Sequence, residues 1–424
     1  MPTVAAKRRM DNPSEATHIN GMDSDVLITG GGLNGLTLAL ALARAGISST
    51  VIDRTPPDDH KARDFDGRSY ALALTSMRML GALGLGDLQQ QPILEIKVSD
   101  GRAGQGASPL FLHFDHAEIE EGPMGYMVED RHLRPALLGA VAAEPLITHL
   151  TGANVARQST DTGCAQVVLA TGEALKGHLI IGADGKFSGT AQRAGIKRMG
   201  WDYGQTALVC AIAHEKPHNG IAHQFFMPEG PLAILPLTGN RSSIVWTEST
   251  ANAAALNGAD SEAYLTALRP RFGNFLGEIG LEGSRHSYPL ALSLANSFIA
   301  ERVALVGDAA HGVHPIAGQG LNAGLKDCAA LAEVLADAKR RGQDLASAVA
   351  LGEYQRWRRF DTATLAMATD GFNRLFSNDN GLLRTVRDLG MGAVNAWPGL
   401  RRRFIREAAG LTGDIPRLMQ GRAL

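Results

Sequence analysis

Two glycine-rich segments, far apart in the chain, carry the residue types that bind phosphates and sugar hydroxyls. The first is Gly30-x-Gly32-x-x-Gly35, and the second begins at Gly307-Asp308 and runs through a glycine-rich turn to Asp327. Glycines let backbone N–H groups approach a pyrophosphate, and a carboxylate at the end of a buried strand accepts hydrogen bonds from sugar hydroxyls. Together the two segments indicate nucleotide chemistry.

The first segment has the surroundings of a β-α-β unit. The apolar run 25–29 predicts a buried parallel strand, and the run 36–46 predicts a helix that ends at a glycine. Gly30 permits the tight turn, Gly32 permits approach to a pyrophosphate, and Gly35 lets the helix pack closely on the strand. A motif of this kind is weak evidence when it stands alone, but the flanking strand and helix make it a phosphate-binding turn.

The residues within and after this motif complete the predicted contacts to the nucleotide. Leu33 and Asn34 lie between the glycines, at the start of the helix. The next predicted strand, 49–52, ends at Asp53, which is placed to accept from ribose hydroxyls, and Arg54 follows it. We therefore expect dinucleotide binding, although this unit does not distinguish NAD from FAD because both contain ADP.

The second segment distinguishes the two cofactors. The run 302–307 predicts another buried strand, and Asp308 at its end is placed to accept from the ribityl chain of a flavin. A helix is predicted to begin near Gly320-Leu321, and its positive end beside the isoalloxazine would stabilise the anionic reduced flavin. The cofactor contacts expected from this segment are Gly307, Asp308, Gly320, Leu321 and Asn322. An ordinary strand-turn-helix of an α/β fold is the alternative at this point.

A third motif, Gly182-Ala183-Asp184-Gly185, follows the predicted strand 179–181. The three motifs, in this order, resemble those of the aromatic-ring hydroxylases of the single-component flavoprotein monooxygenase type, which have the 4-hydroxybenzoate hydroxylase fold. The resemblance implies FAD as cofactor and places Asp184 and Gly185 in its surroundings. It also implies that Arg68 contacts the pyrophosphate or the flavin edge, and that Arg131 contacts the cofactor.

A narrower resemblance covers most of residues 24–375 and points to the ubiquinone-biosynthesis hydroxylases. It implies O2-dependent hydroxylation of the aromatic ring of a polyprenylated phenol through a flavin C4a-hydroperoxide. Two positions depart from the pattern: Asp53 replaces the commoner Glu, and Asp130 stands where an amide is often seen. The segments that carry the resemblance are 66–72, 203–207, 224–226, 230–237 and 243–247.

The same resemblance names a catalytic turn. It implies that Pro315 and the turn of Gly318, Gln319 and Gly320 lie over the flavin ring, where oxygen is activated. His311 and His314 are more consistent with loop geometry fixed by hydrogen bonds than with a general base. They do not form a metal signature, because further ligands at suitable spacing are missing from the sequence around them.

Several alternatives stay open at the level of sequence. A flavin-dependent prenyl reductase shares the fold and would saturate double bonds without consuming O2. Two further functions are open. The protein could be a hydroxylase of a small soluble phenol, or a non-catalytic, FAD-stabilised member of a biosynthetic assembly. The electron donor is either NAD(P)H or a ferredoxin-type protein, because the chain carries no separate nicotinamide-binding motif.

Length and patterning predict an α/β fold: a Rossmann-type FAD-binding domain interleaved with a β-sheet substrate domain, plus a C-terminal helical region. The 424 residues, 45% of them hydrophobic, suffice for a large core. Short apolar segments separated by turns predict strands in the substrate domain, and Glu129–Ala143 reads as a helix. The expected divisions are a disordered arm at 1–23, the FAD-binding domain at 24–93, 128–200 and 291–350, the substrate domain at 94–127 and 201–290, and the helical region at 351–424.

Charge and cysteine content narrow the partners and the location. A net charge of -2 argues against nucleic acid as a partner. The three cysteines form no CxxC pattern, so we expect reduced thiols, no zinc site and a cytoplasmic location. An uninterrupted apolar span of about 18 residues is missing, so a transmembrane helix is not expected. A homodimer stays open.

The C-terminal region turns basic at Arg401-Arg402-Arg403, beside Trp397 and Phe404. Apolar anchors next to cations suit a peripheral site at the inner face of a membrane with anionic lipids. We favour slightly a helix packed on the catalytic body or on a partner in a biosynthetic complex, because Pro398 and several glycines interrupt the apolar face.

Overall fold

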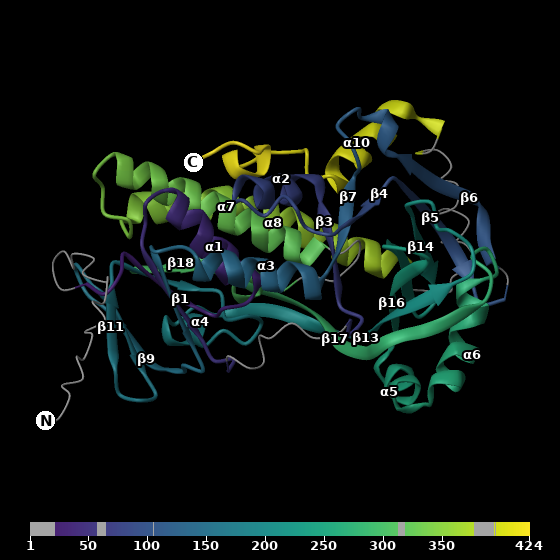
Figure 1. Cartoon of the computed structure of the whole chain (residues 1–424), viewed down its shortest axis with the longest axis horizontal. Coiled ribbons are helices and arrows are strands. Elements are labelled where there is room, and N and C mark those ends of the chain that lie inside the picture. Colours follow the sequence, from purple (N-terminus) through teal and green to yellow (C-terminus); the bar gives the residue numbers. More distant parts are fainter. Residues whose placement is uncertain (1–21, 57–64, 105, 313–318, 377–393, 395) are drawn as a thin grey trace, which may run out of the picture.

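The computed structural model describes residues 22–56, 65–104, 106–312, 319–376, 394 and 396–424. Figure 1 shows a mostly parallel sheet under helices in one part of the molecule and a larger, mostly antiparallel sheet in the other. The long strands β13 (Arg198–His214) and β17 (Ile279–Ala295) run from one part to the other. The predicted α/β class, with a Rossmann-type part, a β-sheet part and C-terminal helices, is confirmed.

A six-stranded sheet in the order β18-β19-β12-β1-β2-β8 forms the Rossmann-type part. All its pairs are parallel except β18 with β19. The central strands are buried and apolar because helices cover the sheet, and the strands predicted near 25–29, 49–52, 179–181 and 302–307 all form. The strands are β1 (Val26–Thr29), β2 (Ser49–Asp53), β8 (Ile147–Thr151), β12 (Leu179–Gly182), β18 (Ile299–Ala300) and β19 (Val303–Leu305).

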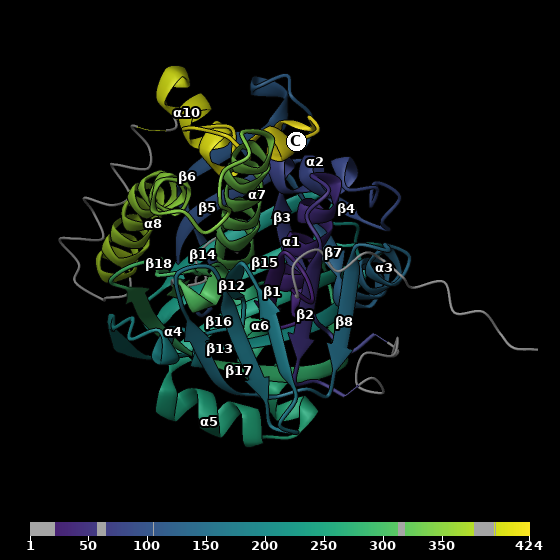
Figure 2. The ribbon, with the colours of Figure 1, turned by 90° about the vertical axis from the view of Figure 1, so that its left-hand side faces the viewer.

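Four helices lie side by side along this sheet in the order α8, α7, α1, α3 (Figure 2). They are α1 (Leu33–Arg44), α3 (Asp130–Ala142), α7 (Gln319–Arg340) and α8 (Ala348–Phe376). Their apolar faces and the strands form one core. Smaller elements complete this part: α2 (Leu74–Ala82), α4 (Gly189–Arg193), a sheet of β3 (Ser69–Ala73), β7 (Gly125–Glu129) and β4 (Gln91–Ile93), and a sheet of β11 (Ala174–Gly177), β10 (Ala165–Leu169) and β9 (Val155–Thr160).

The eight-stranded sheet has the order β20-β17-β13-β16-β15-β14-β5-β6. Its neighbours are antiparallel except β14 and β5. The sequence suggests a change of domain near residues 200 and 290. β13 runs through the first position and β17 through the second, so continuous strands join the two parts. The other strands are β5 (Glu95–Arg102), β6 (Gly106–Asp115), β14 (Ile221–Met227), β15 (Gly230–Leu237), β16 (Arg241–Ser249) and β20 (His311–Gly312).

The sequence predicts strands in the substrate domain, and this expectation is wrong between β16 and β17. Two helices form there, α5 (Thr250–Gly258) and α6 (Ser261–Phe272). Ser249 and Asp260 begin them as N-caps, each accepting a hydrogen bond from the backbone N–H three residues later. These two caps are the sequence signal for helices in a stretch that otherwise reads as strands.

The C-terminal region is helical in its described residues, as predicted. α10 (Pro398–Ala408) packs on β6 through Ile405, which is fully buried, and through Phe404, whose ring stacks on Phe114 at 6.3 Å between centroids. This contact agrees with the packed helix that the sequence favours. Within the described ranges, every helix is too short or too polar to cross a membrane.

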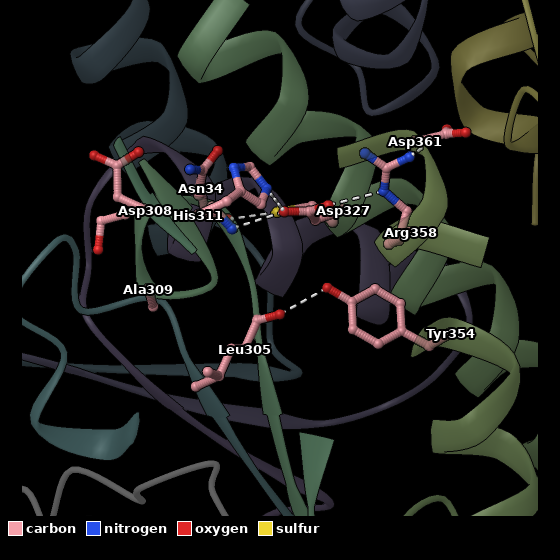
Figure 3. A network of polar contacts seen from close by, with 12 residues as sticks. Asn34, Leu305, Asp308, Ala309, His311, Asp327, Tyr354, Arg358 and Asp361 are labelled. Carbon is pink, nitrogen blue, oxygen red and sulfur yellow. Dashed lines mark hydrogen bonds and ion pairs between the residues drawn. The ribbon is translucent and has the colours of Figure 1, made fainter. Parts of the chain in front are cut away.

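Tyr354 joins α8 to the six-stranded sheet and yields a test of this packing. Its hydroxyl donates to the carbonyl of Leu305 at 2.7 Å, and both residues are fully buried (Figure 3). We expect Tyr354→Phe to lower the free energy of unfolding by about 1–3 kcal/mol, because a buried carbonyl loses its donor. Urea unfolding measures the change, with the same substitution at the half-exposed Tyr288 as control. Equal losses in the two variants would contradict a stabilising role for this bond.

Candidate active site

The two glycine-rich segments meet at the carboxyl edge of the six-stranded sheet. The Asn34 side chain, at the start of α1, lies between them: a Cβ at Gly307, or at Gly324 of α7, would clash with its amide. Gly307 also has a left-handed φ of +59°. Glycine at 307 suits the left-handed backbone, and glycine at 307 and 324 leaves room for the Asn34 amide between α1, α7 and the turn.

The N-terminus of α1 has the form of an anion-binding site. Gly32 caps the helix without a side-chain hydrogen bond, and a Cβ there would meet no atom within 4 Å. The Asn34 Oδ1 atom is buried without a hydrogen-bond partner. Gly30 and Gly35 are instead packed, because a Cβ at either would strike neighbouring backbone oxygen. An open backbone at the positive end of a helix fits the pyrophosphate of FAD.

Asp53 ends β2 beside this turn. Its side chain is 5% exposed, and its Oδ1 accepts from the backbone N–H of Thr55 at 3.0 Å. A Cβ at Gly31 would meet the Asp53 carboxylate, so the acid lies directly against the glycine turn. This position suits a ribose contact, whereas the neighbouring Arg54 is exposed.

A cavity of about 1050 Å³ runs from the glycine-rich turns to the eight-stranded sheet. Gly185 of the third motif and Lys186, which follows it, also line the cavity. Asp308 is exposed toward the cavity, yet the surrounding protein removes enough water to raise the pKa of its carboxyl, against the opposing effects of His311 and Arg198. The residues predicted to contact the cofactor that line this cavity are Gly32, Leu33, Asn34, Arg68, Asp308, Gly320 and Leu321.

The opposite wall of the cavity is one face of the eight-stranded sheet. Side chains of a strand alternate between its two faces, and here every second residue of successive strands is apolar and faces the cavity. Gln224 and Ser243 are polar exceptions, and Phe404 and Ala408 add to the wall from α10. The apolar wall consists of Ile96, Val98, Leu112, Phe114, Ala207, Val209, Ala222, Phe226, Ala233, Leu235 and Val245.

A charged cluster around Asp130 forms the polar side of the cavity. The Tyr70 hydroxyl and Arg134 Nη2 both donate to Asp130 Oδ1, at 2.7 and 2.9 Å. Arg68 Nη2 lies 3.4 Å from Asp130 Oδ2 and 2.7 Å from Asp66. Burial and then the charge of Asp130 raise the pKa of Tyr70 well above its ordinary value, so it remains a donor.

Sequence reasoning identified Arg68 in this cluster but missed Tyr70 and Arg134. The available signal is the spacing of Asp130 and Arg134, one helical turn apart, which favours an ion pair on α3. The pair places a second guanidinium on the cavity wall. Asp130, at the position where an amide is common, therefore has its charge balanced by arginine.

Arg131, the other arginine expected at the cofactor, lies away from the cavity wall. Its Nε donates to Glu129 at 2.7 Å, and its guanidinium lies 5.0 Å from the centroid of the Phe65 ring. Arg241 of β16 bonds the same carboxylate at 2.6 Å and lies 4.8 Å from the same ring. The structure therefore places Arg131 in a contact between α3 and the eight-stranded sheet.

Two other predicted cofactor residues use their side chains to hold nearby backbone. Asp184 accepts from the Ser188 hydroxyl at 2.5 Å and from the Thr190 N–H at 3.0 Å, which shapes the turn before α4. Asn322 accepts from the Ala73 N–H at 2.9 Å, which ties the first turn of α7 to β3. Their side chains thus support the site rather than line its cavity.

The predicted catalytic turn is described only in part. Pro315 and Gly318, and also His314, lie outside the described residues. Gln319 is the first residue of α7, and Gly320 lines the cavity. The start of α7 therefore lies at the cavity, as the sequence predicts for the helix after this turn.

His311 is buried, with 1% of its surface exposed. Its Nε2 lies 2.6 Å from Asp327 Oδ2. A ring held in this way agrees with the loop-fixing interpretation of His311 rather than with a general base at the cavity.

The sequence has extensive similarity to known proteins. It matches the FAD binding domain family over residues 23–364. Ubiquinone hydroxylase UbiL of Rhodospirillum rubrum is 45% identical, over 97% of this chain and 96% of its own length. The 3-demethoxyubiquinol 3-hydroxylase of Escherichia coli is 33% identical, over 92% of this chain and 99% of its own length.

Solved structures show the same fold at low sequence identity. The p-nitrophenol 4-monooxygenase PnpA from Pseudomonas putida has a TM-score of 0.73 and 19% identity, and the match covers 92% of this chain and 98% of that one. PqsL from Pseudomonas aeruginosa has a TM-score of 0.72 and 23% identity, over 86% and 99%. From the sequence matches, the chain belongs to the FAD binding domain family, among the FAD-dependent aromatic-ring hydroxylases that include the ubiquinone hydroxylases.

Proposed function

We propose that this protein is an FAD-dependent monooxygenase that hydroxylates the aromatic ring of a polyprenylated phenol in ubiquinone biosynthesis. The observation that carries the proposal is the cavity, which lies between turns that fit FAD and a largely apolar sheet face. A phenol ring at the FAD side and an apolar chain along the sheet would use both walls. The names of the relatives, ubiquinone hydroxylase and 3-demethoxyubiquinol 3-hydroxylase, support this substrate class.

The residues at the glycine-rich turns would hold FAD. The backbone at Gly32 and the α1 N-terminus would bind the pyrophosphate, Asp53 the ribose, and Asp308 the ribityl hydroxyls. When bound and reduced by NAD(P)H or a ferredoxin-type protein, FAD supplies the O2 activation that ring hydroxylation needs. The protein keeps these acceptors and donors at fixed positions around the cavity.

The remaining walls would orient the substrate and exclude water. Arg68 and Arg134 offer positive charge on the polar side, and Tyr70 stays protonated because its pKa is raised by burial. Gln224 and Ser243 offer hydrogen bonds to oxygen substituents of the ring. The apolar wall keeps bulk water from the reacting carbon, which protects the activated oxygen from side reactions.

The reaction is tested directly on the purified holoprotein with a short-chain prenylphenol and a reducing system. We expect a bound-flavin spectrum, O2 consumption that depends on the phenol, and a product heavier by one oxygen atom. Parallel reactions with NADH, NADPH and a reduced ferredoxin identify the donor. A product heavier by two hydrogen atoms, without O2 consumption, would make the protein a prenyl reductase instead.

The apolar wall is tested by a bulky substitution at Val98, which packs beside Leu112 and Phe226. We expect Val98→Trp to lower kcat/KM for a long-chain prenylphenol by about tenfold, because obstructing a packed pocket costs about 1–3 kcal/mol. A substrate with one prenyl unit should lose little. Val349→Trp, on the exposed side of α8, is the matched control. Equal losses for long and short substrates would contradict a prenyl chain at this wall.

We also propose that α10 rests on an anionic membrane surface from which the prenylated substrate enters. Trp397 is 70% exposed, and Arg402 and Arg403 are exposed beside it. Phe404 joins this surface to the cavity, because its ring lines the apolar wall. Arg401 is already paired with Glu118 at 2.7 Å, so the neighbouring arginines are the ones left to meet lipid.

Vesicle sedimentation tests the membrane contact. We expect the full chain to bind vesicles that contain phosphatidylglycerol, and the double substitution Arg402→Glu/Arg403→Glu to release it, since each arginine near such a surface contributes about 1 kcal/mol. Arg356→Glu/Arg359→Glu, on the exposed side of α8, is the control of equal charge change. Unchanged binding of the α10 variant would rule out this helix as the membrane contact.

A further inference from the structure

Asp327 lies at the centre of a buried ionic network. The side chains of this network do not line the cavity. Asp327 belongs to α7, is fully buried, and connects two other segments (Figure 3). Its Oδ2 accepts from the Gly307 N–H at 2.9 Å and lies 2.6 Å from His311 Nε2. Its Oδ1 accepts from Arg358 Nε at 2.8 Å. One carboxylate therefore holds the 307–311 segment and helix α8 together.

Arg358 extends the network from α8. Its side chain is 2% exposed, and its Nη1 donates to Asp361 Oδ2 at 2.7 Å. The same oxygen accepts from Lys326 Nζ at 2.6 Å, so two acids face two bases. Burial alone would raise the pKa of Asp327, but His311 and Arg358 outweigh it and hold the pKa below its ordinary value. The carboxylate thus stays ionised and remains an acceptor.

The segment that Asp327 holds passes from one sheet to the other. β19 ends at Leu305 in the six-stranded sheet, and His311 pairs with Leu294 in the eight-stranded sheet as β20. The two Asp327 contacts, at Gly307 and His311, lie near the two ends of this passage. Asp308 lies between them and lines the cavity, and its carboxylate points away from Asp327 (Figure 3).

We propose that Arg358 is a positioning residue for the FAD site. Its guanidinium fixes the Asp327 carboxylate, and that carboxylate fixes the turn on which Asp308 meets the ribityl chain. Arg358 itself is not a cavity-lining residue, so its action is indirect. The proposal rests on the FAD binding of the proposed function and is independent of the phenol substrate.

The experiment measures FAD affinity and stability separately. FAD is removed from the full chain and titrated back, with quenching of flavin fluorescence as the signal, while thermal unfolding of the apoprotein gives Tm. We expect Arg358→Met to raise the Kd for FAD by about tenfold, the lower end of what substitution of an outer partner costs at metal sites. Arg358→Lys keeps the positive charge but loses the planar guanidinium. Compared with Arg358→Met, it should restore the Tm of the apoprotein more fully than it restores the Kd for FAD.

Tyr354→Phe is the matched control, because Tyr354 lies one turn earlier on α8 and makes no bond to Asp327. It should lower Tm and leave the Kd for FAD nearly unchanged. If Arg358→Met lowers Tm and changes Kd no more than Tyr354→Phe does, the residue only stabilises the fold and the proposal is wrong.

A second variant covers the case in which Arg358→Met fails to fold because the buried Asp327 carboxylate loses its guanidinium partner. Asp327→Asn/Arg358→Met removes both charges and keeps an amide oxygen that accepts from the Gly307 N–H. We expect this double variant to fold and to bind FAD about tenfold more weakly, as when a residue that supports a metal ligand is substituted. Wild-type affinity in the folded double variant would overturn the proposal. FAD affinity is read without substrate, so an error in the assigned phenol leaves this result intact.

Discussion

The close approach of α1 to α7 at Asn34 is the constraint on which the site depends. Gly307 and Gly324 have no side chains, and the Asn34 amide occupies the space that side chains there would need. This contact brings the turn after β1 close to the turn after β19, as the binding of one dinucleotide at both turns would require. The requirement links residues near the two ends of the matched family region, which spans 23–364.

Strands, motifs and the cofactor class could be predicted from the sequence because each depends on local pattern. Apolar runs before the glycine motifs predict buried parallel strands, and β1, β12 and β19 formed where these runs lie. Helices α5 and α6 were missed because their apolar residues are spaced among alanines and polar residues. Their N-caps, Ser249 and Asp260, carried the signal that hydrophobic pattern did not.

The individual site residues were harder to predict, because a motif does not separate contact with a ligand from support of the backbone. Asp184 and Asn322 stand beside residues that line the cavity, yet their side chains hold local turns. Arg131 and Arg134 lie on the same helix, and only the second lines the cavity. That choice follows from Glu129, two residues before Arg131, and from the Phe65 ring, which comes from a segment distant in sequence.

The joint between the two sheets explains why supporting residues are so frequent here. The cofactor turns belong to the six-stranded sheet, whereas the apolar wall belongs to the eight-stranded one, and a reacting ring must be held by both. An error of about 1 Å in their relative position can lower the rate of such a reaction by about 100-fold. The long strands β13 and β17 fix the position of one sheet relative to the other, because each runs through both parts of the molecule. The segment from β19 to β20 also passes between the sheets, but it is too short to be held by strand pairing along its length. A buried carboxylate that bonds near both ends of the passage supplies the rigidity that the backbone alone does not.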